Sequence, residues 1–263
     1  MKSFVIARTP IQYVDKDQPL SYALEIMDSK DLSALPVVDN GKFIGIITIR
    51  GIMDRIWSER VRIVNLSSLY VSSVMETNVP RISMDTTLIE ACNLMIKCNS
   101  IALPILYDDK PIGMIFEEDI PRLFFDSNID SSGFINRRFR VVDLDSNILH
   151  IRSLMLNENI RFIPIVKDGK FLGVVNDWDI VMALRAIHDR FPLQHRDARV
   201  RSLKASDVMR FTKSIFYGYP SMGVIARIIV ENKSLGAIAL NEDRSVLGIV
   251  DLKAFVKIAC GVS

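Results

Sequence analysis

The chain has 263 residues, 49% of them hydrophobic and 24% charged, with a formal net charge of +2. It can bury the core of one large or two medium domains, and its charge gives no general drive toward nucleic acid or an acidic membrane. Three cysteines without metal-ligand spacing indicate free thiols, and no apolar run approaches the ~18 residues of a membrane span. The first apolar run is too short for a signal peptide, so we expect a cytoplasmic globular protein without a metal site.

One spacing recurs four times along the chain. A methionine, a proline and a glycine follow one another at intervals of nine residues in three places, and the fourth place keeps the intervals with valine and alanine as the first two. Repetition at fixed internal spacing predicts one structural motif present four times and joined by variable linkers. The residues are Met27, Pro36 and Gly45; Met95, Pro104 and Gly113; Met155, Pro164 and Gly173; and Val230, Ala239 and Gly248.

In the first repeat, apolar residues on one helical face are followed by two short apolar strands, 35–38 and 42–48. An Asn40-Gly41 pair between the strands is a typical signal of a tight hairpin turn. A second helix follows the glycine strand. The predicted helical face consists of Leu20, Ala23, Leu24 and Met27, and we interpret the methionine as a core residue.

The second and third repeats predict the same elements, with short strands at 81–83 and 140–142 before their helices. Thr87 and Glu90 can form a capping box, and Asp145 and Ser146 stand just before the third helix. The motif is therefore β-α-β-β-α, which predicts an α/β (α+β) fold. The helical faces are Leu88, Ala91, Leu94 and Met95, then Ile148, Ile151, Leu154 and Met155; Asp168-Gly169 is the third turn.

Motifs of about fifty residues rarely fold alone, since a ~60-residue piece buries only ~60% of its chain surface. We therefore expect pairs, with the boundary in the polar run 126–133 and linkers at 55–72 and 185–206. The first pair is predicted in 1–128, with motifs at about 8–58 and 72–125. The second is predicted in 133–263, with motifs at about 134–188 and 206–261. We expect the pairs to associate face to face, within a chain or across a homodimer.

The stretch 161–164, taken with 173–179, combines an arginine, a predicted helix start and a carboxylate. A helix N-terminus favours an anion, Arg161 can bind phosphate, and Asp179 can accept two ribose hydroxyls. These are parts of a nucleotide site. On this stretch alone, an ion pair on a surface hairpin is the favoured interpretation.

The four motifs resemble the cystathionine β-synthase (CBS) domain family. The resemblance rests on 35–39 with 41–48 and on their counterparts around Pro104, Pro164 and Ala239; 73–75 and 207–209 look like the family's leading motif. In the family, motifs pair into modules, often called Bateman modules. Their clefts commonly bind AMP, ADP, ATP or S-adenosylmethionine. The resemblance therefore implies an adenine nucleotide as ligand and no prosthetic group.

The family pattern after the glycine strand is Gly-apolar-apolar-Thr/Ser-x-x-Asp, whose hydroxyl tends to meet phosphate and whose Asp tends to meet ribose. The second and third motifs keep the acid, as Asp119 and Asp179, and the first and fourth replace it by Gly51 and Ala254. At the hydroxyl position stand Thr48, Phe116, Asn176 and Asp251, of which Thr48 matches and Asn176 is a polar substitute.

Arg161, three residues before Pro164, resembles the phosphate-binding arginine of AMP-activated kinase γ subunits, and the other motifs have Ser33, Ile101 and Gly236 there. We expect the third cleft to bind most tightly, the second more weakly, and the others little. The Asp179 and Arg161 side chains are expected at a solvent-accessible rim. The implied nucleotide-binding residues are Arg161, Phe162, Ile163, Pro164, Asn176, Asp179, Phe139, Arg140, Asp119, Ile101, Ala102, Val79 and Thr48.

For Asp119 and Asp179 the alternative interpretation is an acid that satisfies free N–H groups at a helix N-terminus. The predicted function is a ligand-sensing regulatory protein rather than an enzyme, because four motifs fill the chain and it lacks a nucleophile–base pair or a Walker loop. The sequence does not name the regulated partner, and S-adenosylmethionine or NAD are alternative ligands.

Two other functions stay open: a scaffold subunit with empty clefts, and a nucleic-acid-binding protein that uses the basic stretch 185–204. A solvated linker is the simplest interpretation of that stretch. Its cations are Arg185, Arg190, Arg196, Arg199, Arg201 and Lys204, and a smaller cluster consists of Arg137, Arg138 and Arg140.

Overall fold

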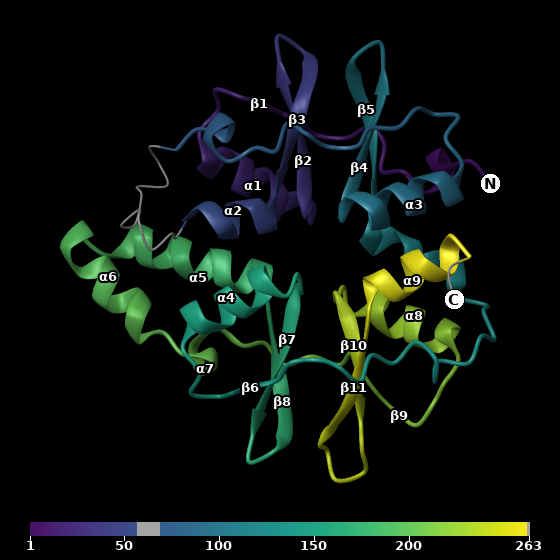
Figure 1. The fold of residues 1–263 in the computed structure, drawn as a ribbon. Helices are drawn as coiled ribbons and strands as arrows, with labels where there is room; N and C mark the ends of the chain where they lie inside the picture. Colours follow the sequence, from purple (N-terminus) through teal and green to yellow (C-terminus); the bar gives the residue numbers. More distant parts are fainter. Residues whose placement is uncertain (57–68, 262–263) are drawn as a thin grey trace. The chain divides into compact units, whose positions relative to one another are not determined.

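The computed structural model describes residues 1–56 and 69–261. Most of the predicted linker between the first two motifs, and the end of the first motif at 57–58, lie outside the described residues. Each repeat contains a helix, an antiparallel hairpin and a second helix, and three of the four begin with a short strand (Figure 1). The predicted α/β fold of four β-α-β-β-α motifs is confirmed.

The first motif contains β1 (Val14–Asp15), α1 (Leu20–Lys30), β2 (Ala34–Asp39), β3 (Lys42–Thr48) and α2 (Ile49–Ile56). The second contains α3 (Leu88–Cys98), β4 (Ala102–Tyr107), β5 (Lys110–Phe116) and the 3₁₀ helix η4 (Glu117–Phe124). The third contains β6 (Val142–Asp143), α4 (Ile148–Asn157), β7 (Phe162–Lys167), β8 (Lys170–Asn176) and α5 (Asp177–Arg190). The fourth contains β9 (Ile215–Tyr217), α8 (Met222–Glu231), β10 (Gly236–Leu240), β11 (Val246–Asp251) and α9 (Leu252–Ala259). Before the first motif lies η1 (Ser3–Ile6), and between motifs lie η3 (Val71–Ser73), α6 (Leu193–Ser202) and α7 (Ala205–Val208).

Within each three-stranded sheet the first strand pairs parallel to the second, which pairs antiparallel to the third. In the second motif the expected strand at 81–83 is reduced to a single bridge between Ile82 and Ile105. The predicted turns have positive φ at both central residues, 49° and 76° at Asn40-Gly41 and 51° and 74° at Asp168-Gly169. This is the turn geometry that matches the twist of a hairpin.

The helices turn their predicted faces inward. Leu20, Ala23, Leu24 and Met27 are fully buried in α1, which confirms that face and the methionine as core. In α3 and α4 the faces are also right, although Leu88, Leu94 and Leu154 are only partly buried. The capping box of Thr87 and Glu90 is present. Asp145 and Ser146 stand just before the third helix as expected, and Asn147 is its N-cap.

The chain divides into two compact units, Met1–Ile120 with Phe255–Ser263, and Pro121–Ala254. The sheets of the first two motifs lie in the first unit and those of the last two in the second. In the first unit the backbone N–H of Phe43 donates to the carbonyl of Asp109, and in the second that of Phe171 donates to Arg244. The motifs are therefore paired into two modules. The boundary expected in 126–133 stays a prediction.

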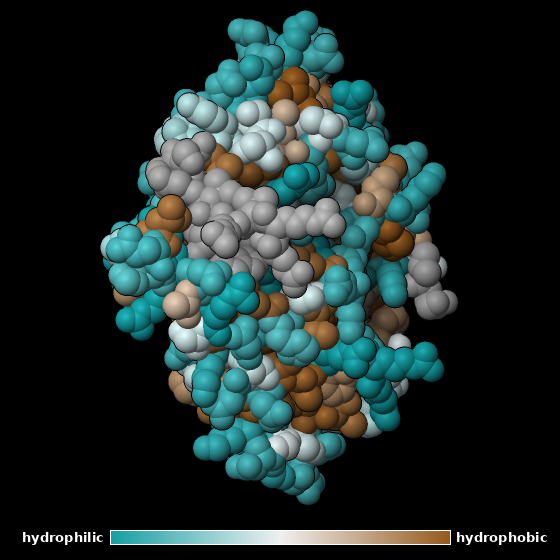
Figure 2. Space-filling model, turned by 60° about the vertical axis from the view of Figure 1, so that its left-hand side comes forward, coloured by the Kyte–Doolittle hydropathy of each residue, from teal (hydrophilic) through white to brown (hydrophobic). Residues whose placement is uncertain are grey.

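The core of the second unit joins its two motifs. Phe162 and Phe171 of the third motif form one buried cluster with strand residues of the fourth: Ile238, Leu240 and Ile249. On the face shown in Figure 2, hydrophilic residues cover more of the surface than hydrophobic ones. No helix within 1–56 and 69–261 is long and apolar enough to cross a membrane. All three cysteines are free, and burial raises the pKa of Cys92 to about 12, which makes it a poor nucleophile.

Candidate functional site

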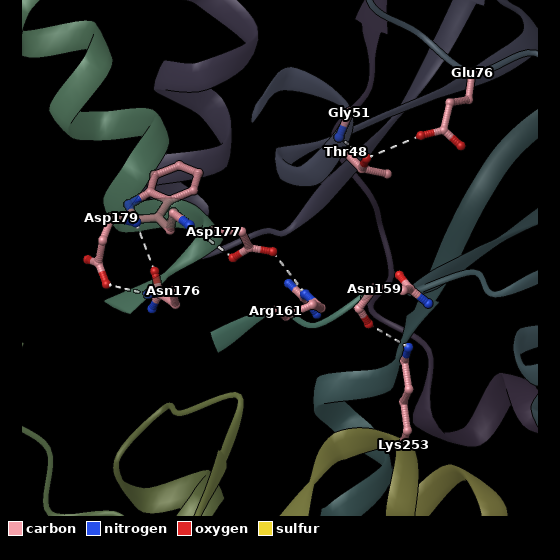
Figure 3. A network of polar contacts seen from close by, with 10 residues as sticks. Thr48, Gly51, Glu76, Asn159, Arg161, Asn176, Asp177, Asp179 and Lys253 are labelled. Carbon is pink, nitrogen blue, oxygen red and sulfur yellow. Dashed lines mark hydrogen bonds and ion pairs between the residues drawn. The ribbon is translucent and has the colours of Figure 1, made fainter. Parts of the chain in front are cut away.

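The start of α5 fixes the Asp179 carboxylate. Asn176 is the N-cap, and its side-chain oxygen accepts a hydrogen bond from the backbone N–H of Asp179 at 2.8 Å. In return, Asp179 Oδ2 accepts the backbone N–H of Asn176 at 3.0 Å (Figure 3). The alternative interpretation, in which Asp179 satisfies a backbone N–H at a helix N-terminus, is therefore confirmed. Asn176, expected to substitute for a phosphate-binding hydroxyl, uses its oxygen as a cap.

The second oxygen of Asp179 is engaged from outside the third motif. Oδ1 accepts a hydrogen bond from Nε of Arg210, a residue of the segment that leads into the fourth motif. The carboxylate is buried, whereas 53% of the Arg210 side chain is exposed. Burial raises the pKa of Asp179, although Arg210 and the N–H of Asn176 act in the opposite direction. The acid is thus held at a fixed place by one backbone and one arginine donor.

Arg161 is buried and paired with Asp177. Its Nε lies 3.0 Å from Asp177 Oδ2, and the two side chains are only 7% and 1% exposed (Figure 3). Asp177 Oδ1 also accepts the backbone N–H of Trp178 at 2.9 Å. The expected solvent-accessible rim is therefore wrong for both Arg161 and Asp179. An ion pair was the simpler interpretation of this stretch, but the pair is buried rather than on a surface hairpin.

In the second motif, Arg8 holds the Asp119 carboxylate through both oxygens. Its Nε donates to Oδ2 at 2.8 Å and its Nη2 to Oδ1 at 3.1 Å. The remaining Nη1 donates to the backbone oxygen of Asp31 at 2.9 Å, and the guanidinium lies 4.5 Å from the ring centre of Phe116. Phe116, which replaces the family's hydroxyl, is fully buried and supports the arginine.

The residue three positions after each motif glycine decides how the next helix starts. Thr48, Asn176 and Asp251 each accept the backbone N–H of the residue three positions later, and an α-helix follows. Phe116 has no side-chain acceptor, and the second motif continues as the 3₁₀ helix η4, which contains Pro121. Because the polar residues at this position cap helices, their presence alone does not indicate phosphate binding.

The first motif has Gly51 in place of the acid, but a carboxylate from the segment that leads into the second motif lies beside this glycine. Glu76, from the segment that leads into the second motif, places Oε1 3.4 Å from Oγ1 of Thr48 (Figure 3). A Cβ on Gly51 would lie 3.2 Å from that oxygen. The glycine at the acid position therefore leaves room for an acid supplied by the partner motif.

The other predicted residues are mostly part of the core. Phe162 packs against Gly236, where a Cβ would come within 2.6 Å of its ring, and Phe139 lies against the same cluster. Ile163, Pro164, Ile101 and Ala102 are buried, and Val79 is half-buried. The exposed Arg140 does not join Arg161, because its Nε is 2.8 Å from both oxygens of Glu158.

The basic stretch 185–204 is largely helical, covering the end of α5 and α6, where we had considered a solvated linker. Several of its cations are already engaged. Arg201 pairs with Asp197 at 2.9 Å, Lys204 with Asp145 at 2.8 Å, and Arg199 stacks on the Phe191 ring. Arg137 of the smaller cluster donates to the hydroxyl of Tyr219. Nucleic-acid binding by this stretch stays a prediction.

Sequence reasoning missed four residues that lead into the motifs, although the leading motifs 73–75 and 207–209 stand directly before two of them; the four are Arg8, Glu76, Asn136 and Arg210. Each forms an antiparallel bridge with the residue that follows the glycine of its partner motif. Comparison of the repeats could have found the position, since Arg8, Glu76 and Asn136 each lie 28 residues before their own motif proline. It could not have found the partners, because the pairing crosses between motifs. The bridges are Arg8–Met114, Glu76–Ile46, Asn136–Ile249 and Arg210–Val174.

A metal site finds no support in the part of the chain that the structure describes, where no group of three or more His, Cys, Asp or Glu residues could hold an ion.

Comparison with known proteins gives one consistent result. Residues 3–58, 71–125 and 132–186 match the family model described as CBS domain. MJ1225 of Methanocaldococcus jannaschii is 25% identical over 255 residues, which cover 89% of this chain and 90% of that protein. MJ1404 of the same organism is 29% identical over 64% of this chain, but the match spans only 44% of MJ1404.

Two solved structures agree with the fold over nearly the whole chain. The crystal structure of MJ1225, described as a proposed archaeal homologue of g-AMPK, has a TM-score of 0.86 at 22% identity and covers 98% of this chain and 99% of that one. A structure from Pyrococcus horikoshii has a TM-score of 0.65 at 15% identity and covers 98% and 100%. At these identities the likeness shows the fold alone.

Proposed function

Because this chain belongs to the CBS-domain family, we propose that it is a regulatory protein that binds an adenine nucleotide, AMP, ADP or ATP, and has no catalytic role of its own. The third motif is its principal site. The observation that carries the proposal is the buried carboxylate of Asp179, which is oriented at the start of α5 by Asn176.

Asp179 is suited to a diol such as that of ribose. An ionised carboxylate has about four acceptor positions on two oxygens, and the Asn176 N–H and Arg210 take two of them. The Arg210 contact comes from an exposed side chain, so two ribose hydroxyls can replace it on this carboxylate. Hydrogen bonds to a charged acceptor are stronger than neutral ones, and a carboxylate that is already oriented loses little freedom when the ligand binds.

Arg161 has a different role from the one expected. Since its guanidinium is buried against Asp177, we assign it to holding the end of β8 and the start of α5 in place, and not to direct phosphate contact. A regulatory effect then requires that the nucleotide prefer one arrangement of the paired motifs, because a ligand shifts an equilibrium only by its differential affinity.

A thermal-shift screen with AMP, ADP, ATP, NAD and S-adenosylmethionine tests the proposal. A ligand at ~100 times its dissociation constant should stabilise the protein by ~2.7 kcal/mol. The Asp179→Ala variant should lose about half of this response or more. Asp189→Asn is the matched control, because Asp189 lies near the opposite end of α5 and pairs with Arg185 there. A wild-type protein that responds to none of the adenine nucleotides contradicts the proposal.

A further inference from the structure

The four leading residues occupy equivalent places in the modules but differ in charge. The backbone of each leading residue is held by its bridge to the partner motif, so the point from which its side chain extends is fixed as well. Arginine occurs where the partner motif has an acid: Arg8 opposite Asp119 and Arg210 opposite Asp179. Where the partner has Gly51 or Ala254, the leading residue is Glu76 or Asn136. In this chain, therefore, each acid is accompanied by an arginine from the other motif.

The two arginines hold their acids to different degrees. Arg8 uses Nε, Nη1 and Nη2, stacks on the buried Phe116 and is 31% exposed. Arg210 donates one hydrogen bond, through Nε, and is 53% exposed. A bidentate, stacked guanidinium is fixed in geometry as well as in charge, whereas a single contact from an exposed side chain is exchanged more easily.

We propose that Arg8 and Arg210 compete internally with the ligand, each covering the carboxylate that would receive the ribose hydroxyls. The firm contact of Arg8 keeps the second motif closed, and the looser contact of Arg210 lets a ribose-containing ligand open the third. This inference rests on the proposed function, because it concerns the same carboxylates.

The competition has a simple thermodynamic form. When only a fraction of the molecules has its carboxylate uncovered, the apparent dissociation constant equals the intrinsic one divided by that fraction. Removal of the arginine should raise the fraction to one and strengthen binding. An arginine that serves as a contact for the ligand would have the opposite effect on removal, and one that only braces the fold would have none.

Calorimetric titration of the full chain with adenosine separates these cases. Adenosine has a ribose but no phosphate, so the loss of a positive charge does not change phosphate attraction. Wild type should bind one adenosine per chain, and Arg8→Gln should bind two. Arg210→Gln should keep its stoichiometry and bind about 10-fold more tightly, the lower end for one charged hydrogen bond.

Further variants assign the effect. Asp119→Ala added to Arg8→Gln should remove the second adenosine. Arg8→Lys keeps the charge but not the bidentate fork, so it should open the second motif in part and also serves if Arg8→Gln folds poorly. The controls are Lys2→Gln, which removes the ion pair with Asp85, and Arg227→Gln, which removes the one with Asp126. Both should titrate like wild type.

The two proposals fail differently. If wild type binds adenosine or AMP but both arginine variants bind unchanged or more weakly, the competition is overturned and the proposed function stands. If neither wild type nor any arginine variant binds adenosine or AMP, both are overturned. Binding of adenosine by Arg8→Gln at a site that requires Asp119 supports both.

Discussion

The second and third motifs place an acid at the same position of the repeat, yet the two acids are held differently. Asp119 is gripped through both oxygens by an arginine that stacks on Phe116. Asp179 shares its oxygens between its own helix cap and a single contact from Arg210. The accessibility of each acid therefore depends on its own motif, through Phe116 or Asn176, as well as on the arginine from the segment that leads into the partner motif.

The two motifs also differ in the residues that stabilise the start of the helix on which the acid lies. The third has the buried pair of Arg161 and Asp177, where the second has Ile101 and Glu117. The third has an N-cap at Asn176, where the second has Phe116. The third motif thus presents its acid on a capped α-helix braced by an ion pair, and the second presents it on a 3₁₀ helix. The predictions below test each part of this contrast.

Arg161→Ala should have the largest effect, a loss of about 3–5 kcal/mol in the free energy of unfolding, because it leaves the buried Asp177 without its cation. Urea unfolding measures the loss. Arg140→Ala is the control: its pair with Glu158 is exposed, so stability should stay close to wild type. Equal losses in the two variants would show that burial of the Arg161 pair is not what matters.

Asp179→Ala should weaken adenosine and AMP about 10- to 150-fold, the equivalent of roughly 1.5–3 kcal/mol for hydrogen bonds to a charged group. Asp119→Ala in the otherwise wild-type chain should leave the affinity unchanged, since Arg8 already covers that acid. Titration calorimetry on both variants gives the comparison. A larger loss from Asp119→Ala would reverse our assignment of the principal site.

Much of the fold could be predicted because it is local and repeated. The helical faces, the Asn-Gly and Asp-Gly turns and the Thr87 capping box each depend on a few neighbouring residues. The repeated spacing of Met, Pro and Gly then predicted the same motif at further places in the chain. The second helix of the second motif, η4, differs from its counterparts and follows Phe116, which was noted in the sequence only as a replacement for a phosphate-binding hydroxyl.

The site was harder to predict because its contacts join segments distant in sequence. Arg8 and Asp119 are 111 residues apart, and Arg210 and Asp179 are 31 apart. Arg161 was singled out as a phosphate-binding residue, whereas the structure pairs it with Asp177, a residue to which the sequence assigned no role. The capping role of Asn176, by contrast, depends only on neighbouring residues, since an asparagine just before a helix is a typical N-cap.

Asn176→Ala should cost about 1 kcal/mol of stability through the loss of the cap, and Thr48→Ala in the first motif should cost a similar amount. Chemical denaturation of the two variants tests whether the position acts alike in both motifs. Asn157→Ala is the control, because its amide contacts only Ser153 on the surface of α4 among the described residues. Two variants as stable as the control would mean that capping does not explain why these motifs form α-helices.

The smallest effect concerns the protonation of Asp179. Burial raises the pKa of Asp179 above its usual value of 3.8, so between these two values the unfolded chain loses the proton first and stability falls as pH rises. Asp179→Asn removes this loss and keeps an acceptor for the Asn176 N–H. The stability of the variant relative to wild type should therefore grow as pH rises from 3.8 and level off above the folded-state pKa.

Glu158 is the contrasting control, because Arg140 lowers the pKa of its carboxyl. Wild type should gain stability relative to Glu158→Gln as pH rises toward the usual pKa of that residue. Urea unfolding across this pH range measures both slopes. When stability is taken as variant minus wild type in both cases, the slope should be positive for Asp179→Asn and negative for Glu158→Gln, and a negative slope for both would mean that Arg210, and not burial, dominates the environment of Asp179.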